Sequence, residues 1–204
     1  MGAKPAPSSA GDEADLGGES TPTTGPEVSG EIAIVPELEL MVPDLRSRDR
    51  MGAIKEMVDR LHQAGCVTDS LSFLQSVLAR EALESTVVGE GVAFPHARSR
   101  TATRLGMAVG LSRLGVDFHS DAHASRVHLV CLLAVPALRD EGYLDSLGVL
   151  SGLFQDAEFR SGLRACRTHD EMCKHISLGL QQGNGRSSTL RKASHLQTAA
   201  RTQT

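Results

Sequence analysis

The sequence predicts a single α/β domain, a sandwich in which helices flank a central mixed β-sheet. Three observations indicate this class. Helical apolar spacing comes first, short strand-like runs and one long apolar run follow, and helical spacing returns after about residue 140. Because helices lie on both sides of the strands in sequence, both faces of the sheet are expected to be covered. A chain of 204 residues, 40% of them hydrophobic, is long enough for one such domain with tails.

Composition divides the chain into three segments. Residues 1–30 are rich in Ala, Gly, Ser, Thr and Pro, which predicts a disordered tail because little apolar surface is available to offset the entropy of ordering. Residues 36–180 are expected to form the domain. Residues 181–204 contain basic residues and no acid, which predicts a polar basic tail.

Two helices are predicted first, over Arg48–Ala64 and Ser70–Ala82. Each has apolar residues three and four positions apart, which places them on one helical face. Gly65 directly follows the first helix, at the position where a residue with positive φ commonly ends a helix. The expected inward residues are Met51, Ile54, Val58 and Leu61 in the first helix and Leu71, Leu74, Val77 and Leu78 in the second.

The middle of the domain is expected to contain four strands. Short strands are predicted around Val87 and at Val92–Phe94, and a longer one at about Leu105–Leu111. The run Val127–Val135 is almost continuously apolar, which is typical of a strand buried on both faces, and Pro136 is expected to end it.

Three helices are predicted to close the domain, over about Glu141–Phe154 behind an Asp140 cap, over Ala157–Arg164, and from Thr168 onward. Thr168 and Glu171 have the spacing of a capping box. The residues expected to face the core are Leu144, Leu147, Leu150, Phe154, Met172, Ile176 and Leu180.

His96 is the strongest candidate for a functional residue. The short apolar strand ending at Phe94 is followed by Pro95 and then by His96. Proline cannot continue a sheet ladder and keeps the preceding residue extended, so His96 is expected just past a strand end on a stiff backbone. A neutral imidazole nitrogen presented in this way is a potential nucleophile.

A second candidate, Arg80, lies sixteen positions before His96. The stretch REALESTVVGEGVAFPHARS, which begins at Arg80, resembles the enzyme IIA (EIIA) domain of the phosphoenolpyruvate-dependent sugar phosphotransferase system (PTS). The similarity is to the fructose/mannitol type, which includes the nitrogen-regulatory branch, and it extends more weakly from about Leu38 to Ile176. The matching motif positions are Arg80, Glu81, Thr86, Gly89, Gly91, Ala93, Pro95 and His96.

This resemblance implies the PTS EIIA type-2 fold and phosphohistidine chemistry. His96 would accept a phosphoryl group from the phosphocarrier protein HPr and pass it to an enzyme IIB domain, or hold it as a signal for regulatory target proteins. Arg80 suits the role of a clamp on phosphoryl oxygens, and backbone N–H groups of the Gly89–Gly91 turn are expected to donate as well. The chain would then be a phosphotransferase component that needs no metal or organic cofactor.

Tyr143 departs from the family pattern. Many members carry a second histidine near the start of the helix that follows the buried strand, and Tyr143 aligns with it here. Tyrosine keeps a hydroxyl donor but carries no positive charge. We therefore expect a weaker clamp and slower or less reversible phosphoryl transfer.

Two alternatives stay open. One is a phosphorylation-incompetent regulatory binding module on the same fold, which Tyr143 favours. The other is a metal-binding regulatory protein that uses His119, Asp121, His123 and His128. No carboxylate or thiol set at structural-zinc spacing accompanies these histidines, so a solvated loop is the favoured interpretation of this segment.

Charge and hydropathy restrict the remaining function classes. The formal net charge of −4 argues against nucleic-acid partners. No apolar run approaches the ~20 residues of a membrane span, and the N-terminus lacks the pattern of a secretory signal, so a cytoplasmic location is expected. An EIIA domain without an obvious IIB or membrane component fits the nitrogen-regulatory branch better than a sugar permease.

Overall fold

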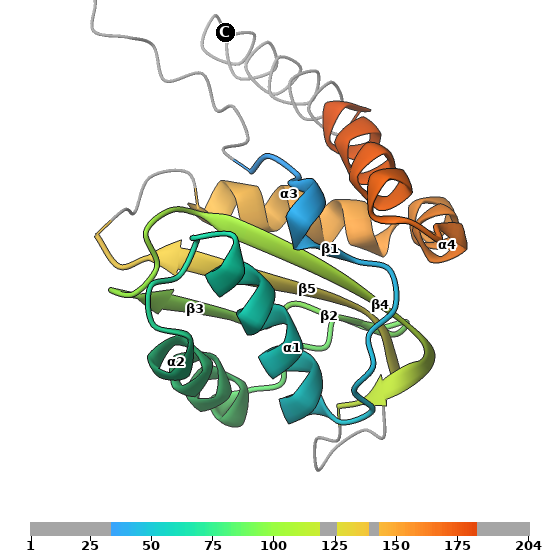
Figure 1. Ribbon diagram of the computed structural model, residues 1–204. Helices are drawn as coiled ribbons and strands as arrows, with labels where there is room; N and C mark the ends of the chain where they lie inside the picture. The colour runs from blue at the N-terminus through green and yellow to red at the C-terminus, as the bar shows by residue number, and fades with distance from the viewer. Residues whose placement is uncertain (1–33, 119–125, 139–142, 183–204) are drawn as a thin grey trace, which may run out of the picture.

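The computed structural model describes residues 34–118, 126–138 and 143–182, which form one α/β sandwich. Figure 1 shows the layers: a mixed five-stranded sheet lies between two groups of helices. The helices α1 (Arg50–Gln63) and α2 (Ser70–Leu83) cover one face. The helices α3 (Tyr143–Gln155) and α4 (Ala157–Ala165) lie on the other face, followed by a helix over 169–182. The predicted fold class is confirmed.

The sheet is built around two long strands that pair antiparallel, β4 (Gly106–Asp117) and β5 (Arg126–Pro136). On the outer side of β4 lies β1 (Met41–Val42), which follows the 3-10 helix η1 (Leu38–Leu40) and pairs parallel. On the outer side of β5 lie β2 (Val92–Ala93) and β3 (His96–Ser99), both parallel to β5. The strand β5 is therefore central, in agreement with the burial predicted from its apolar sequence.

The strands β2 and β3 are two parts of one edge strand that Pro95 interrupts. Val92 pairs with Leu129 and His96 pairs with Leu133, so the register along β5 is the same before and after the interruption. Proline has no N–H to donate to the ladder. His96 therefore lies past the end of β2, as predicted, but it also begins β3, a strand that was not predicted.

Helix ends follow the local sequence signals. Asp49, Asp69 and Asp156 accept hydrogen bonds from backbone N–H groups in the first turns of α1, α2 and α4. Gly65, at φ +71°, follows α1, and the next residue, Cys66, donates its N–H to Leu61 O, as in a Schellman ending. These contacts fix where the helices begin and end relative to the sheet.

The predicted capping box is also confirmed. The N–H of Glu171 donates to Thr168 Oγ1 at 3.1 Å, and the N–H of Thr168 donates to Glu171 Oε2 at 3.2 Å. This reciprocal pair starts the helix over 169–182 at the position that the sequence indicated.

The core lies on both faces of β4 and β5. Eight of the residues from Val127 to Val135 are at most 1% exposed, and His128 alone is half-buried. Two residues expected to face inward do not: Met51 is 60% exposed and Leu71 is 64% exposed, because each lies in the first turn of its helix, beyond the edge of the packed layer. None of the described helices is long and apolar enough to cross a membrane.

Several predictions concern residues outside the described ones. They include the disordered tail over residues 1–30, most of the basic tail over 181–204, and the Asp140 cap. The domain boundaries at 36 and 180 stay predictions.

Candidate functional site

His96 is held by its own neighbouring backbone. Its side chain is half-buried, and Nδ1 lies 2.9 Å from the carbonyl oxygen of Phe94. A carbonyl oxygen can only accept, so Nδ1 carries the hydrogen in this contact. In the neutral ring the lone pair is then on Nε2. The geometry therefore leaves Nε2 as the ring nitrogen of His96 with a free lone pair.

Phe94, which supplies that carbonyl, is anchored on two sides. Its backbone N–H leaves the ladder and donates to Thr86 O at 3.0 Å. Its ring packs edge-on against Phe154 of α3, with ring centroids 5.3 Å apart, and Phe154 in turn contacts Phe159 of α4 in the same way. Such edge-to-face pairs contribute about 0.5–1.5 kcal/mol beyond the burial of their area. The carbonyl that orients His96 is thus attached to the helices on one face of the sheet.

Thr86 is fixed by Glu81, a buried acid in the last turns of α2. Glu81 is 3% exposed, and its carboxylate accepts from Thr86 N–H at 3.2 Å and from Thr86 Oγ1 at 2.6 Å. Hydrogen bonds to an ionised acceptor are the stronger kind, about 1.5–3 kcal/mol each. A continuous series of hydrogen bonds therefore runs from Glu81 through Thr86 and Phe94 to His96.

Arg80 lies next to Glu81, and α2 packs against β3, the strand that His96 begins. Its Nη1 donates to the carbonyl oxygen of Glu84 at 3.1 Å, and its Nη2 lies 3.9 Å from the Glu84 carboxylate. Within the described residues no hydrogen bond joins Arg80 to His96. In this structure Arg80 interacts with the C-terminal end of α2, where the helix dipole favours a positive charge. Its role as a phosphoryl clamp stays a prediction.

The turn before His96 has an unusual backbone. Gly89, Glu90 and Gly91 all have positive φ, at +86°, +41° and +77°. Glu90 is the only non-glycine residue with positive φ in the described part of the chain, and its carboxylate forms an ion pair with Arg160 of α4. This ion pair attaches the turn to the helical face that also holds Phe94.

Arg160 connects the turn to two helices. It is 8% exposed, and its Nη1 donates to the carbonyl oxygens of Phe154 at 3.1 Å and Gln155 at 2.5 Å, at the C-terminal end of α3. The same guanidinium reaches Glu90 through Nη2. One buried arginine therefore joins α3, α4 and the turn that precedes the site.

Two predicted sites lie partly or wholly outside the described residues. Tyr143 is the first residue of α3, which agrees with its expected place at the helix start, but its side chain lies outside the described part of the structure. His119, Asp121 and His123 also lie outside it. His128 is described, and its Nδ1 donates to the carbonyl oxygen of Ser112 at 2.9 Å.

The sequence predicts Arg80 and His96 as site residues but does not reveal the residues that contact and support them. Glu81 was recognised only as part of a motif, and Arg160 was not identified at all. A charged residue among apolar helix positions was the available signal for both, since buried charges are rare unless they are paired or hydrogen-bonded. The carbonyl groups of Phe94 and Thr86 belong to the backbone, so the pattern of side chains in the sequence could not reveal that they orient His96.

Comparisons with known proteins show which family this chain resembles. Residues 37–178 match the model of the family described as "Phosphoenolpyruvate-dependent sugar phosphotransferase system, EIIA 2". The PTS fructose-specific EIIABC component of Bacillus subtilis is 32% identical over 134 residues, which are 66% of this chain but 21% of that protein. The PTS fructose-specific EIIA component of Haloferax volcanii is 31% identical, over 65% of this chain and 86% of that one.

Solved structures show the same fold. The nitrogen regulatory protein IIA-Ntr of Neisseria meningitidis superposes with a TM-score of 0.63 at 26% identity, covering 72% of this chain and 97% of that chain. The predicted type-2 EIIA fold is thereby confirmed. This chain spans about a fifth of the length of the B. subtilis relative.

Proposed function

Because the chain belongs to the PTS EIIA 2 family, we propose that it is a phosphohistidine carrier that accepts a phosphoryl group from an HPr-like protein on Nε2 of His96. One observation carries this proposal. The Nδ1–H of His96 is engaged by Phe94 O, which leaves Nε2 as the free nucleophile on a half-buried ring.

In the proposed reaction the lone pair of Nε2 attacks the phosphorus of the donor's phosphohistidine. A new N–P bond forms as the donor's N–P bond breaks, and the donor imidazole leaves with the electron pair. The His96 ring gains positive character during the attack, and the hydrogen bond from Nδ1 to Phe94 O stabilises that charge. No proton has to leave His96, so the reaction needs no separate general base.

Arg80 is the proposed cation for the transferred group. Phosphoryl transfer depends on positioning and on donors for the charge on the equatorial oxygens. A guanidinium has five N–H donors, so Arg80 can turn from the exposed Glu84 to a phosphoryl group at the cost of one hydrogen bond and a weak ion pair. We expect Arg80→Gln to slow phosphorylation by tenfold or more while leaving the fold intact.

The direct test is phosphorylation with enzyme I, HPr and labelled phosphoenolpyruvate. We expect an acid-labile label on the wild type and none on His96→Ala. His169→Ala is the matched control, because His169 is an exposed histidine at the start of the helix over 169–182. Absence of label on the wild type, or equal label on His96→Ala, would overturn the proposal.

Tyr143 is proposed to limit the rate of transfer. A tyrosine at the start of α3 offers a hydroxyl donor but no cation to the phosphoryl oxygens. Tyr143→His should therefore accelerate phosphorylation, and rapid-quench measurement of the labelling rate checks this. An unchanged rate in that variant would show that Tyr143 does not limit phosphoryl transfer.

A phosphorylation-incompetent binding module is the second candidate. It is favoured by the hydrogen bond that keeps Arg80 on the end of its own helix. The labelling experiment separates the two candidates, since this module would bind an HPr-like protein without accepting the phosphoryl group.

The downstream role is proposed to be regulatory, and the similarity to IIA-Ntr supports this. A phosphoryl group adds negative charge at the end of β2, which would change affinity for protein partners. Incubation of the phosphorylated chain with a fructose-type EIIB domain tests this, because rapid loss of label to EIIB would favour a sugar relay instead.

A further inference from the structure

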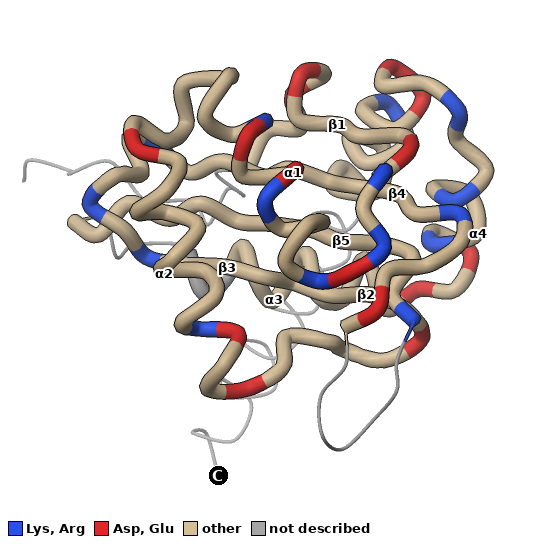
Figure 2. The backbone as a smooth tube through the Cα atoms, turned by 60° about the horizontal axis from the view of Figure 1, so that its bottom comes forward, with Lys and Arg blue, Asp and Glu red and all other residues tan. Residues whose placement is uncertain are grey.

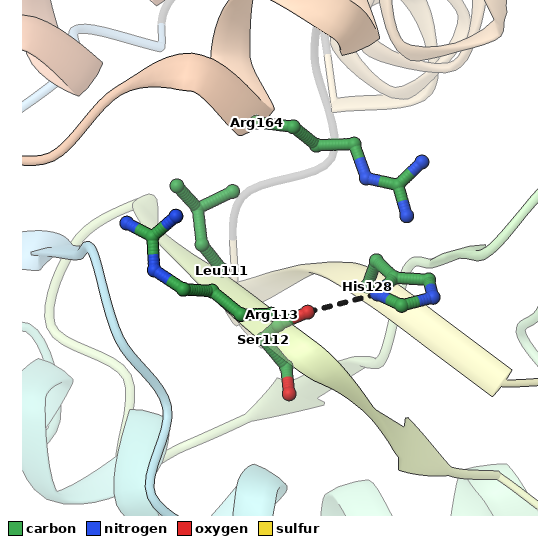
Figure 3. A pocket seen from close by; sticks show the side chains of 5 residues that line it. All are labelled: Leu111, Ser112, Arg113, His128 and Arg164. Carbon is green, nitrogen blue, oxygen red and sulfur yellow. Dashed lines mark hydrogen bonds between the residues drawn. The ribbon is translucent and has the colours of Figure 1, made fainter.

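A pocket with two arginines and a histidine among its lining residues lies between β4, β5 and α4, away from His96. It has a volume of about 200 Å³ and is lined by Leu111, Ser112, Arg113, His128 and Arg164. Figure 3 shows the Arg164 side chain extending from α4 on the same side as the His128 ring, with Arg113 forming the opposite wall. No acidic side chain is among its lining residues.

An irregularity in β4 creates this pocket. The pairing between β4 and β5 shifts register between Leu111 and Val116, so His128 lies opposite a four-residue bulge. Gly115 in the bulge has φ +80°, and a Cβ there would lie 3.2 Å from His128 Cε1. The absence of a side chain at Gly115 therefore lets the His128 ring lie close against the bulge. Bulges of this kind often redirect a side chain next to a functional site.

The donors in the pocket are only partly used. His128 Nδ1–H donates to Ser112 O, which leaves Nε2 for a ligand. Arg113 donates one long hydrogen bond, 3.4 Å, to Cys166 O, and its other N–H groups have no partner among the residues that the structure describes. Arg164 is exposed and forms no hydrogen bond or ion pair with any residue that the structure describes. Figure 2 shows that both basic and acidic positions lie around α4.

We propose that this pocket binds the phosphate group of a small phosphate monoester. Guanidinium groups recognise phosphate oxygens through paired N–H donors. Donors here come from two separate elements, Arg113 on β4 and Arg164 on α4, and Nε2 of His128 can accept the hydrogen of a singly protonated phosphate. This arrangement suits a tetrahedral anion with several oxygens better than a planar carboxylate. The volume is below the roughly 300–1,000 Å³ of pockets for drug-sized ligands, so the ligand is a small metabolite or free phosphate.

This site is distinct from the proposed phosphorylation site. His96 pairs with Leu133 on β5, whereas His128 lies five residues earlier on the same strand. At about 3.3 Å per residue the two positions are roughly 16 Å apart along the strand. Binding in the pocket therefore does not require His96 or its phosphorylation, and failure of the phosphocarrier proposal would leave this one untouched.

Titration of the ¹⁵N-labelled full chain with glycerol 3-phosphate, inorganic phosphate, malate and glycerol at constant ionic strength tests the proposal. We expect saturable shifts of the amide signals of Ser112–Gly115 and His128 with the two phosphates and none with glycerol. The double variant Arg113→Gln/Arg164→Gln should bind at least tenfold more weakly. Arg60→Gln, an arginine substitution on α1 across the sheet, should bind as the wild type does, and His96→Ala should too.

Tighter binding of glycerol 3-phosphate than of inorganic phosphate would identify a monoester as the ligand, and equal binding would identify free phosphate. Both results support a phosphate site. Malate binding as tight as phosphate binding would overturn the assignment to phosphate. Unchanged affinity in the double variant, shifts confined to Phe94–Ala97, or absence of saturable binding would overturn the site itself.

Discussion

The decisive residue-scale feature is the buried carboxylate of Glu81. Its two hydrogen bonds fix Thr86, whose carbonyl oxygen fixes the backbone of Phe94, whose carbonyl oxygen orients His96. Each bond joins groups close in sequence, but the series as a whole connects α2 to the start of β3. His96 is therefore oriented by a series of hydrogen bonds that begins at a buried acid in α2.

We expect Glu81→Ala to lower the free energy of unfolding by about 2–4 kcal/mol, because two charge-assisted hydrogen bonds are lost and Thr86 N–H is left buried without a partner. Urea denaturation followed by circular dichroism measures the change. Glu84→Ala is the matched control, with an expected change below about 0.5 kcal/mol, since the Glu84 side chain is 81% exposed. Equal effects of the two substitutions would show that Glu81 has no special role.

At the scale of elements, the turn between Val88 and Val92 aligns β2 with β5. Gly91 O accepts hydrogen bonds from the N–H groups of His128 at 2.7 Å and Leu129 at 3.0 Å. The backbone of the turn thus sits directly against β5, and a side chain at Gly91 would intrude there. Gly89, in the same turn, faces open space.

The two glycines allow a matched comparison. A Cβ at Gly91 would lie 3.1 Å from Arg126 O, at φ +77°, whereas a Cβ at Gly89 would meet no atom within 4 Å, at φ +86°. Gly89→Ala should cost about 1 kcal/mol for its backbone conformation alone, and Gly91→Ala about 2–3 kcal/mol because crowding adds to the same strain. Thermal unfolding of both variants checks the order. A larger loss for Gly89→Ala would contradict this account of the turn.

Strands were harder to predict than helices for a physical reason. Helix ends depend on nearby residues, so Gly65 and the Thr168–Glu171 box were readable from sequence. The strands β1 and β3 have two and four residues, and β3 includes exposed Arg98 beside buried Ala97 and Ser99. Such short segments become strands through pairing with β4 and β5, which local sequence does not encode.

At the scale of the whole molecule, Arg160 and the aromatic residues Phe94, Phe154 and Phe159 join the site to the helical face beyond the sheet. The motif in the sequence supplies the residues expected to do the chemistry. Some of the residues that hold them in place come from α3 and α4, far along the chain. For this reason the sequence could indicate His96 as the candidate but not how it is held.

Arg160→Met tests this connection. The substitution keeps an unbranched apolar stem but removes the donors to Phe154 O, Gln155 O and Glu90, so we expect a loss of about 2–4 kcal/mol in the free energy of unfolding. Arg164→Met, one helical turn later and exposed, should change it by less than about 0.5 kcal/mol. Chemical denaturation of both variants measures the difference. Similar stabilities would show that Arg160 does not stabilise the connection between the turn, α3 and α4.

The most direct test of the central claim is the position of the phosphoryl group on the His96 ring. Nuclear magnetic resonance of the ¹⁵N-histidine-labelled chain, phosphorylated through enzyme I and HPr, distinguishes the two ring nitrogens. The hydrogen bond between Nδ1 and Phe94 O predicts phosphorylation at Nε2 with Nδ1 still protonated. A phosphoryl group on Nδ1, or no phosphohistidine at His96, would contradict the account.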